Sequence, residues 1–450
     1  MKREKFSSQL GFLLTTAGCA IGLGNVYRFP YITGQYGGAF FVLIYLLCLL
    51  AMGLPLVVME LSVGRGSRRS AARAFQELRP DKKGWKFWQI VPALGNYIFQ
   101  IFYTTITAQI LYYVFAMLTG RLRGMDAAGL QAVSDGLNQN PALLGSLMAV
   151  VVLGAFGVCY GGLQNSVERI SKWMLCVLFV LLIILGLYSL TLPGAGAGLR
   201  FYLSPNPESL KDAGLYEVIS AAFGQSFFTL GFGAGSLCIF GSYMSRERRL
   251  TGQAVKVIAL DTSVALVSGL IIFPACFTYG INPANGPNLI MVTMPAVFNE
   301  MPGGYFLGAL FFIAMFMAAM STNLAAFENI VACTMDLSGW SRKKAVLLNV
   351  LPMILLSLPA VLGMSVWSDF TLLGRDIMGI EDFLVSNNLL PIGAMGYLLF
   401  CVTRYGWGWS GFLEEANTGF GCRFPGWIRK YCTYFLPLLL LAFWITGYIG

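Results

Sequence analysis

The sequence predicts an all-α polytopic membrane protein whose two halves cross the membrane in opposite directions. Three observations support this. Hydrophobic residues make up 57% of the 450 residues and charged residues only 11%, less than half the usual share in a soluble protein. Apolar runs long enough to span a bilayer recur along the whole chain. The first and sixth of these runs are interrupted by glycines at corresponding places in the two halves.

Eleven apolar runs have lengths close to the roughly 20 residues that a membrane helix needs. They lie near 10–33, 39–63, 88–118, 142–161, 166–192, 216–243, 253–280, 303–334, 344–363, 377–402 and 427–449. We expect no cleavable signal peptide, because the first run is too long and contains polar residues.

The lysine and arginine residues give the chain an orientation. With the N-terminus inside, 24 of the 30 basic residues fall in inside segments, five fall outside, and Arg28 lies within the membrane. This distribution obeys the positive-inside rule. We therefore expect a multi-pass protein of the bacterial inner (plasma) membrane, with a cytoplasmic N-terminus and an external C-terminus. The net charge of +9 then reflects a basic cytoplasmic face beside anionic lipid, not nucleic-acid binding.

The first run is broken between Gly18 and Pro30, a stretch that holds three glycines, Asn25 and Arg28. Glycine weakens a helix, proline removes a hydrogen-bond donor, and a buried charge is costly in lipid. Irregular backbone at membrane depth survives where protein or a watery cavity surrounds it. The stretch therefore predicts a broken helix that lines a site. The alternative is a helix whose glycines allow close packing, which leaves Asn25 and Arg28 unexplained.

The sixth run carries Gly231, Gly233 and Gly235 at its centre and enters the membrane from the opposite side. Inverted repeats with paired broken helices are typical of secondary transporters, whose site lies near the midplane. We expect one transporter domain over 1–450, with a first repeat at 8–192 (helices 1–5), a second at 216–403 (helices 6–10), and helix 11 at 427–449.

No catalytic constellation is visible. The chain has no histidine, and its ten cysteines show no metal-ligand spacing. The sequence therefore predicts a protein that is not an enzyme, binds no organic cofactor and binds no nucleic acid. Its expected partners are a small-molecule substrate and the lipid bilayer, without an obligate protein partner.

Several motifs resemble the neurotransmitter:sodium symporter family. They are Gly18–Pro30, Gly37–Phe40, Gly53–Pro55 followed by Met59 and Glu60, Gly224–Leu230, and the pair Ser321–Thr322. The count of eleven helices, without a twelfth, resembles the shorter bacterial amino-acid transporters of the LeuT type. The resemblance implies the LeuT fold: a 5+5 inverted repeat with 11 transmembrane helices, of which helices 1 and 6 are unwound. It also implies sodium-coupled import of an amino acid by alternating access, with two Na⁺ ions.

The resemblance implies two sodium sites. Site 1 would use Ala20, Asn25, Thr229 and Asp261, and site 2 would use Gly18, Ile21, Ala318, Ser321 and Thr322. At Asp261 the family usually has Asn, so a fixed carboxylate could replace the chloride that some members bind near the positions of Tyr45, Gln225 and Thr229. We therefore expect chloride independence. Alternatively, Asp261 faces water at a helix end, and Ser321 and Thr322 bond only to their own helix.

The same resemblance places a zwitterionic substrate between the two broken helices. Its expected contacts are Ala20, Leu23, Gly24, Phe99, Tyr103, Phe228, Thr229, Gly231, Ala234, Thr322, Asn323 and Ala326. No aspartate stands at Cys19–Ala20, where amine transporters carry one, so an amino acid fits better than a monoamine. The mostly apolar wall favours a hydrophobic or aromatic L-amino acid, although ordinary packing is an equal explanation for Phe99, Ala234 and Ala326.

The remaining charges suggest gates. The resemblance pairs Arg28 with Asp382 outside and Arg3 with Asp336 inside, the latter supported by Phe6, Gln9 and Tyr243. We expect Glu60 to bond to the break in helix 1, and the sequence does not explain Glu328. Two other functions remain open: a proton-coupled amino-acid transporter of the same fold, and a receptor or channel-like protein that does not transport.

Overall fold

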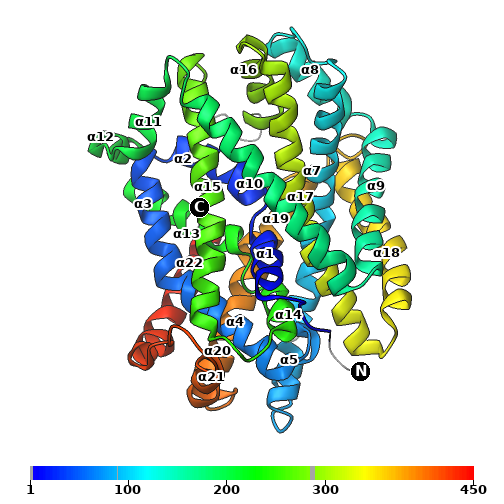
Figure 1. Cartoon of the computed structure of the whole chain (residues 1–450), viewed down its shortest axis with the longest axis vertical. Coiled ribbons are helices and arrows are strands. Elements are labelled where there is room, and N and C mark those ends of the chain that lie inside the picture. The colour runs from blue at the N-terminus through cyan, green and yellow to red at the C-terminus, as the bar shows by residue number, and fades with distance from the viewer. Residues whose placement is uncertain (1–3, 89, 284–288, 450) are drawn as a thin grey trace.

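The computed structural model describes residues 4–88, 90–283 and 289–449. Within these ranges the elements are helical and no β-strand is formed, which confirms the all-α prediction. The long helices run near the long axis of the molecule (Figure 1). Helices α5 and α21, expected inside, lie at one end, and α8, α11 and α16, expected outside, lie at the other (Figure 1).

The first half of the chain contains ten α-helices and three short π-helical turns within the described residues. They are α1 (Gln9–Ala20), η1 (Gly24–Arg28), α2 (Phe29–Gln35), α3 (Ala39–Cys48), η2 (Leu49–Gly53), α4 (Leu54–Ser67), α5 (Ala71–Leu78), α6 (Trp85–Trp88), α7 (Ile90–Leu118), α8 (Ala127–Asn138), α9 (Pro141–Tyr160), η3 (Leu163–Glu168) and α10 (Arg169–Ser189).

The second half likewise consists of long helices joined by short ones. They are α11 (Ala195–Leu203), α12 (Pro207–Ala213), α13 (Leu215–Leu230), α14 (Ser236–Tyr243), α15 (Leu250–Thr278), η4 (Leu289–Thr293), α16 (Met294–Glu300), α17 (Gly304–Ser338), α18 (Arg342–Gly363), α19 (Ile377–Leu384), η5 (Val385–Leu389), α20 (Leu390–Val402), α21 (Gly408–Ala416), η6 (Gly426–Ile428), η7 (Tyr431–Phe435) and α22 (Leu436–Ile449).

Both expected helix breaks are present. Gln9–Ala20 and Gly24–Gln35 meet at an angle of 52°. Helix α13 ends at Leu230 and α14 begins at Ser236, and between them Gly231, Gly233 and Gly235 have φ angles of +56°, +91° and +86°. Residues other than glycine rarely adopt this left-handed region, which explains the three glycines.

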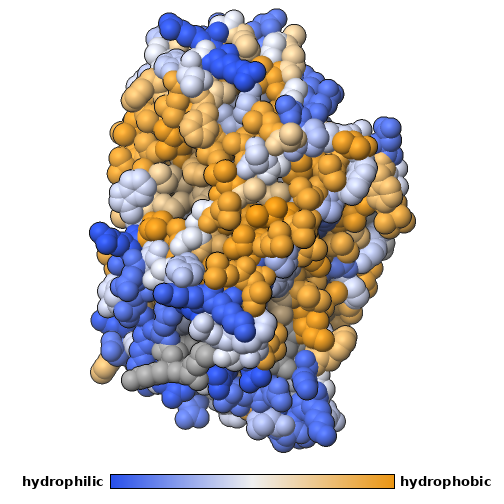
Figure 2. Space-filling model, turned by 90° about the vertical axis from the view of Figure 1, so that its right-hand side faces the viewer, coloured by the Kyte–Doolittle hydropathy of each residue, from blue (hydrophilic) through white to orange (hydrophobic). Residues whose placement is uncertain are grey.

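Among the described helices, nine are long and apolar enough to cross a membrane, or ten if the bent pair at residues 9–35 counts as one span. Run 216–243 is divided into α13 and α14, each too short to be counted alone. The total of eleven and the repeat boundaries therefore remain predictions. Apolar side chains form a broad band across the middle of one face, between hydrophilic ends (Figure 2).

Helix α17 packs against α7, α10, α9 and α1 and forms much of the core. Its middle part buries polar side chains as well as apolar ones, including Ser321, Thr322 and Glu328. Buried polar groups in lipid-embedded helices need partners within the protein. Helix α17 therefore supplies polar side chains that can bind a ligand beside the breaks in α1–α2 and α13–α14.

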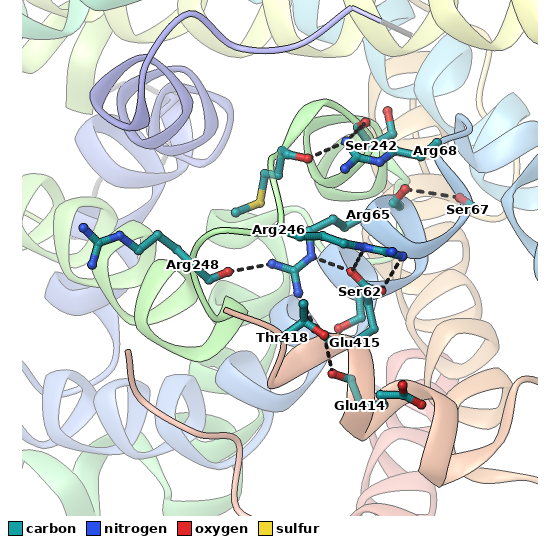
Figure 3. A network of polar contacts seen from close by, with 12 residues as sticks. Ser62, Arg65, Ser67, Arg68, Ser242, Arg246, Arg248, Glu414, Glu415 and Thr418 are labelled. Carbon is teal, nitrogen blue, oxygen red and sulfur yellow. Dashed lines mark hydrogen bonds and ion pairs between the residues drawn. The ribbon is translucent and has the colours of Figure 1, made fainter. Parts of the chain in front are cut away.

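At the end of the molecule that carries α5 and α21, one buried arginine joins three elements. The Arg65 side chain on α4 is fully buried and its Nε donates to Glu415 Oε1 of α21 over 2.7 Å, while its Nη1 donates to the Arg248 carbonyl over 2.6 Å (Figure 3). Arg246 also donates to Glu415, and Arg68 donates to the carbonyls of Ser242 and Met244 (Figure 3). The loop after α14 is thus fixed to α4 and α21.

We expect Gly233→Ala to destabilise the protein by at least about 2 kcal/mol, since a non-glycine residue is strained at this φ. An added Cβ would also lie 2.3 Å from the Leu390 carbonyl oxygen. The matched control is Gly157→Ala in α9, where an added Cβ meets nothing within 4 Å. Thermal unfolding in detergent measures both; equal melting temperatures for the two variants would contradict the structure at this break.

Candidate functional site

The two helix breaks face each other across a small cavity. A Cβ built on Gly24 would lie 2.9 Å from the Phe228 ring and 3.4 Å from Thr229 Cα, so the two breaks touch. The cavity has a volume of about 40 Å³, and it is lined by Cys19, Ala20, Gly22, Gly24, Asn96, Phe99, Tyr103, Phe228, Thr229, Gly231, Ala234, Ser236, Thr322, Ala326 and Leu390. Ligand pockets usually measure roughly 300–1,000 Å³, so this site is contracted.

The residues expected at sodium site 1 form one buried cluster. Asn25 Nδ2 donates to Asp261 Oδ1 over 2.8 Å and to the Asp261 carbonyl over 2.9 Å. Thr229 Oγ1 donates to Asp261 Oδ2 over 3.1 Å, and all three residues are at most 1% exposed. Ala20 is the last residue of α1, so its carbonyl oxygen has no backbone amide of a following helical turn as a hydrogen-bond donor.

This cluster fits a monovalent cation. In the described part of the chain no ion pair involves Asp261, so its carboxylate is held by two neutral donors, Asn25 of η1 and Thr229 of α13. Burying a carboxylate is costly unless a cation compensates it. Carboxylate, amide, hydroxyl and carbonyl oxygens together are the ligands that hard cations prefer. The water-facing alternative for Asp261 does not agree with its complete burial.

The residues expected at sodium site 2 also come together. Ser321 Oγ donates to the Ile21 carbonyl over 3.1 Å and to the Ala318 carbonyl over 2.8 Å. Thr322 Oγ1 lies 3.3 Å from the carbonyls of Cys19 and Ile21. Ser321 therefore bonds both to its own helix and to the broken end of α1. A Cβ on Gly18 would lie 3.4 Å from Ser321 Cβ, so α1 and α17 approach closely here.

Ten of the twelve expected substrate contacts line the cavity, and Leu23 and Asn323 do not. The Leu23 amide donates to the Tyr103 hydroxyl over 3.1 Å, so this amide is already used. Asn323 Nδ2 donates to Thr107 Oγ1 over 2.9 Å and to its own helix, away from the cavity. The Leu23 amide and the Asn323 side chain are therefore bonded within the protein in this structure, and neither residue lines the cavity.

Five lining residues were not among the expected substrate contacts: Cys19, Gly22, Asn96, Ser236 and Leu390. Ser236 Oγ donates to Asn96 Oδ1 over 3.1 Å, which joins α7 to the start of α14. The spacing of Asn96 from Phe99 and Tyr103 is three and then four residues, typical of one helix face. That spacing could have identified Asn96, whereas nothing in the sequence indicated Leu390.

The expected outer pair is not formed in this structure. Arg28 lies over the Phe228 ring with its guanidinium carbon 4.4 Å from the ring centroid. Asp382 Oδ1 instead accepts from Ser386 Oγ over 2.8 Å, and among the described ion pairs none joins Arg28 to Asp382. Since Phe228 lines the cavity, Arg28 covers it through a cation–π contact.

On the inner side, Arg3 lies outside the described residues, so the Arg3–Asp336 pair remains a prediction. Asp336 Oδ2 accepts from the Ser70 amide over 2.7 Å, and its Oδ1 is 4.0 Å from Arg69 Nη1. Phe6 packs edge-on against the Tyr243 ring, with the centroids 5.9 Å apart. Gln9 is exposed at the first turn of α1.

Glu328 and Glu60 receive clear roles from the structure. Glu328 is fully buried and forms a bidentate ion pair with Arg342 over 2.7 and 2.9 Å, and Tyr243 donates to it over 2.6 Å. Glu60 accepts from the amides of Gly233 over 2.6 Å and Cys238 over 3.3 Å. The expectation for Glu60 was therefore wrong: it caps the break between α13 and α14, not the break in α1–α2.

The first described residues are tied to η3 and α18. Glu4 Oε1 pairs with Arg342 Nε over 3.0 Å, and Glu4 Oε2 accepts from the Leu163 amide over 2.8 Å. The buried Glu168 accepts from the Ser7 amide over 2.8 Å and pairs with Lys172 over 3.1 Å. These bonds fix the chain where it enters α1.

Comparison with known proteins shows the family to which the chain belongs. The model of the Sodium:neurotransmitter symporter family matches residues 3–127 and 125–449. An uncharacterised sodium-dependent transporter, YhdH of Bacillus subtilis (strain 168), is 34% identical over 401 residues, covering 89% of this chain and 87% of that protein. The sodium-dependent serotonin transporter of Drosophila melanogaster is 26% identical and covers 100% of this chain and 77% of its own length.

A solved structure is also similar. The crystal structure of MhsT in complex with L-phenylalanine matches with a TM-score of 0.89 and 36% sequence identity, covering 99% of this chain and 100% of that one. MhsT has a LeuT-type fold, so the fold expected from the sequence is confirmed. The chain belongs to the sodium:neurotransmitter symporter family, whose members are sodium-coupled membrane transporters and not enzymes.

Proposed function

We propose that this protein imports a neutral, hydrophobic or aromatic L-amino acid together with two Na⁺ ions, by alternating access and without chloride. The observation that carries the proposal is the pair of oxygen clusters beside one cavity. Asp261 with Asn25 and Thr229 forms the first, and Ser321 with Thr322 at the end of α1 forms the second.

Coupling between sodium and substrate follows because the two oxygen clusters and the cavity have residues in common. Thr229 belongs to the first cluster and Thr322 to the second, and both also line the cavity. A substrate carboxylate in the cavity would therefore lie close to bound sodium, and each would raise the affinity for the other, because such coupling is reciprocal. The Tyr103 hydroxyl, which accepts from the Leu23 amide, can donate its proton to the same carboxylate.

Chloride independence is supported by the carboxylate of Asp261, which supplies a negative charge within hydrogen-bond distance of Asn25 and Thr229. Gln225 Nε2, which could donate a hydrogen bond to a chloride ion, donates instead to the Gly24 carbonyl over 2.7 Å. A second anion beside Asp261 would be repelled at this distance. One fixed charge thus replaces one bound ion.

The substrate class is supported by the cavity wall. Phe99, Phe228, Ala234, Ala326 and Leu390 supply apolar surface. MhsT, which has 36% of its residues in common with this chain, was crystallised with L-phenylalanine. The α1 break carries no acidic side chain for a free amine, since positions 19 and 20 are Cys and Ala.

The membrane arrangement belongs to the same proposal. The end with α5 and α21 faces the cytoplasm of a bacterial cell, the N-terminus lies inside and the C-terminus outside, as the basic residues indicate. The cavity lies between the broken helices of the two repeats, 8–192 and 216–403, and alternating access would open it to each side of the membrane in turn. The contracted cavity beneath Arg28 and Phe228 suits a closed state in this cycle.

The proposal is tested with purified protein in liposomes under an imposed sodium gradient. Uptake of labelled L-amino acids is compared in sodium chloride, sodium gluconate and choline chloride. We expect equal uptake of large hydrophobic or aromatic amino acids in both sodium salts and none in choline. Uptake that persists in choline would instead favour proton coupling, and loss of uptake in gluconate would contradict chloride independence. Sodium-dependent binding without accumulation would indicate a receptor.

A further inference from the structure

A groove with a volume of about 1,130 Å³ opens at the end of the molecule that we assign to the cytoplasm. It lies between α5, the start of the span Trp85–Leu118 and the end of α17. It is far larger than the cavity between the helix breaks and has none of its lining residues in common with that cavity. The transport proposal does not use it.

One wall of the groove is apolar and exposed. Phe87, Ile90 and Leu94 line it and are 72%, 47% and 53% exposed. Ile90 and Leu94 are four residues apart and lie on one face of α7, and Phe87 belongs to α6, just before it. Because α7 is long and apolar enough to cross the membrane, this apolar surface begins where the bilayer interface is expected. Exposed apolar surface of this kind marks a binding surface when water surrounds it.

The groove is also basic. Arg73, Lys83 and Lys86 line it, and all three are exposed. The acid among the described lining residues, Glu77, already pairs with Arg69 over 3.1 Å. The groove therefore offers a positive charge beside an apolar helix face.

We propose that this groove binds one anionic phospholipid of the cytoplasmic leaflet. Arg73, Lys83 and Lys86 hold its phosphate, and an acyl chain lies along Phe87, Ile90 and Leu94. Basic pockets between membrane helices on the cytoplasmic side are suited to anionic headgroups. A soluble phosphate compound would satisfy the cations but leave the apolar wall uncovered, and a zwitterionic lipid would bring no net charge.

The test uses the full chain purified in detergent, with lipid retention measured by native mass spectrometry. Phosphatidylglycerol is compared with phosphatidylcholine of the same acyl chains. We expect one tightly retained phosphatidylglycerol. The triple variant Arg73→Gln, Lys83→Gln, Lys86→Gln should weaken its binding by roughly 100-fold at low salt, about fivefold for each basic residue.

The matched control removes the same charge from exposed residues outside the groove, as Arg423→Gln, Arg429→Gln, Lys430→Gln. It should retain the lipid within about twofold of the wild type, because its cations do not line the groove. A second variant, Ile90→Asn, tests the apolar wall and should weaken phosphatidylglycerol by about tenfold while leaving competition by soluble glycerol 1-phosphate unchanged.

Three results would overturn the proposal. Equal retention of phosphatidylcholine and phosphatidylglycerol would remove the role of charge. Equal losses in the two triple variants would show diffuse attraction to a basic surface and no defined groove. Competition by glycerol 1-phosphate as strong as that by the whole lipid, together with an unaffected Ile90→Asn variant, would show a soluble anion site.

Discussion

Asp261→Asn is expected to reduce the apparent affinity for sodium by about 10²–10³-fold. A unit charge about 4 Å from a cation contributes about 4 kcal/mol of attraction at an effective dielectric constant of about 20. The substitution removes that charge from the sodium site. The amide has nearly the same shape: its oxygen can accept from Asn25, and the Thr229 hydroxyl can turn to accept from its nitrogen. Binding of radioactive ²²Na⁺ to purified protein measures the effect without knowledge of the substrate.

Chloride should partly restore sodium binding in this variant, since a free anion can then take the position of the lost charge. The control is Asp212→Asn, which removes an exposed carboxylate from α12 and should leave sodium binding unchanged. If Asp261→Asn bound sodium with wild-type affinity in gluconate, Asp261 would not belong to a sodium site.

Arg342→Met is expected to lower the stability of the protein by about 3–5 kcal/mol, since removing one partner leaves Glu328 as a buried, unpaired charge. Glu328 is fully buried, and it is bonded to Arg342 and Tyr243. The double variant Glu328→Met, Arg342→Met should recover most of the loss, because it removes both charges. Thermal unfolding in one detergent compares the variants.

Arg404→Met provides the control, because Arg404 is an exposed cation at the same end of the molecule. It should melt close to the wild type. If the double variant were as unstable as Arg342→Met, the loss would come from packing of the long arginine side chain and not from the unpaired carboxylate.

Much of the candidate site could be predicted from local sequence. The glycines at 231, 233 and 235 and the stretch 18–30 indicated both breaks, because backbone conformation depends on a few neighbouring residues. Asp261 could be connected to Asn25 and Thr229 only through the family resemblance. The structure brings these three together, although they come from different helices.

The errors arose where a side chain could reach more than one partner. Glu60 on α4 was assigned to the break in α1–α2, but its carboxylate lies at the break before α14, against which α4 packs. Glu328 remained unexplained because its partner Arg342 starts the next helix, and the sequence does not give the angle between α17 and α18. Tertiary packing decides such pairs, and local pattern does not determine it.

The hydrogen bonds and ion pairs at this end of the molecule join its elements into two bodies, each held together by its own bonds. One contains α4, the loop after α14, and α21, and it is joined by buried charge-assisted bonds. The other contains the start of the chain, η3 and α18, joined through Glu4 and Glu168. Between them lie the Phe6–Tyr243 ring contact and the bond from Tyr243 to Glu328.

A seam of this kind gives opening a defined path. Separating the two bodies would break the ring contacts of Phe6 and the bonds of Tyr243 and Asp336, while the ion pairs within each body persist. The break at residues 231–235, where three glycines have positive φ angles, lies just before α14, where such a movement would be absorbed. The ion pairs of Arg65 and Arg342 would then keep each body rigid, and Tyr243 would hold the two bodies together until they separate.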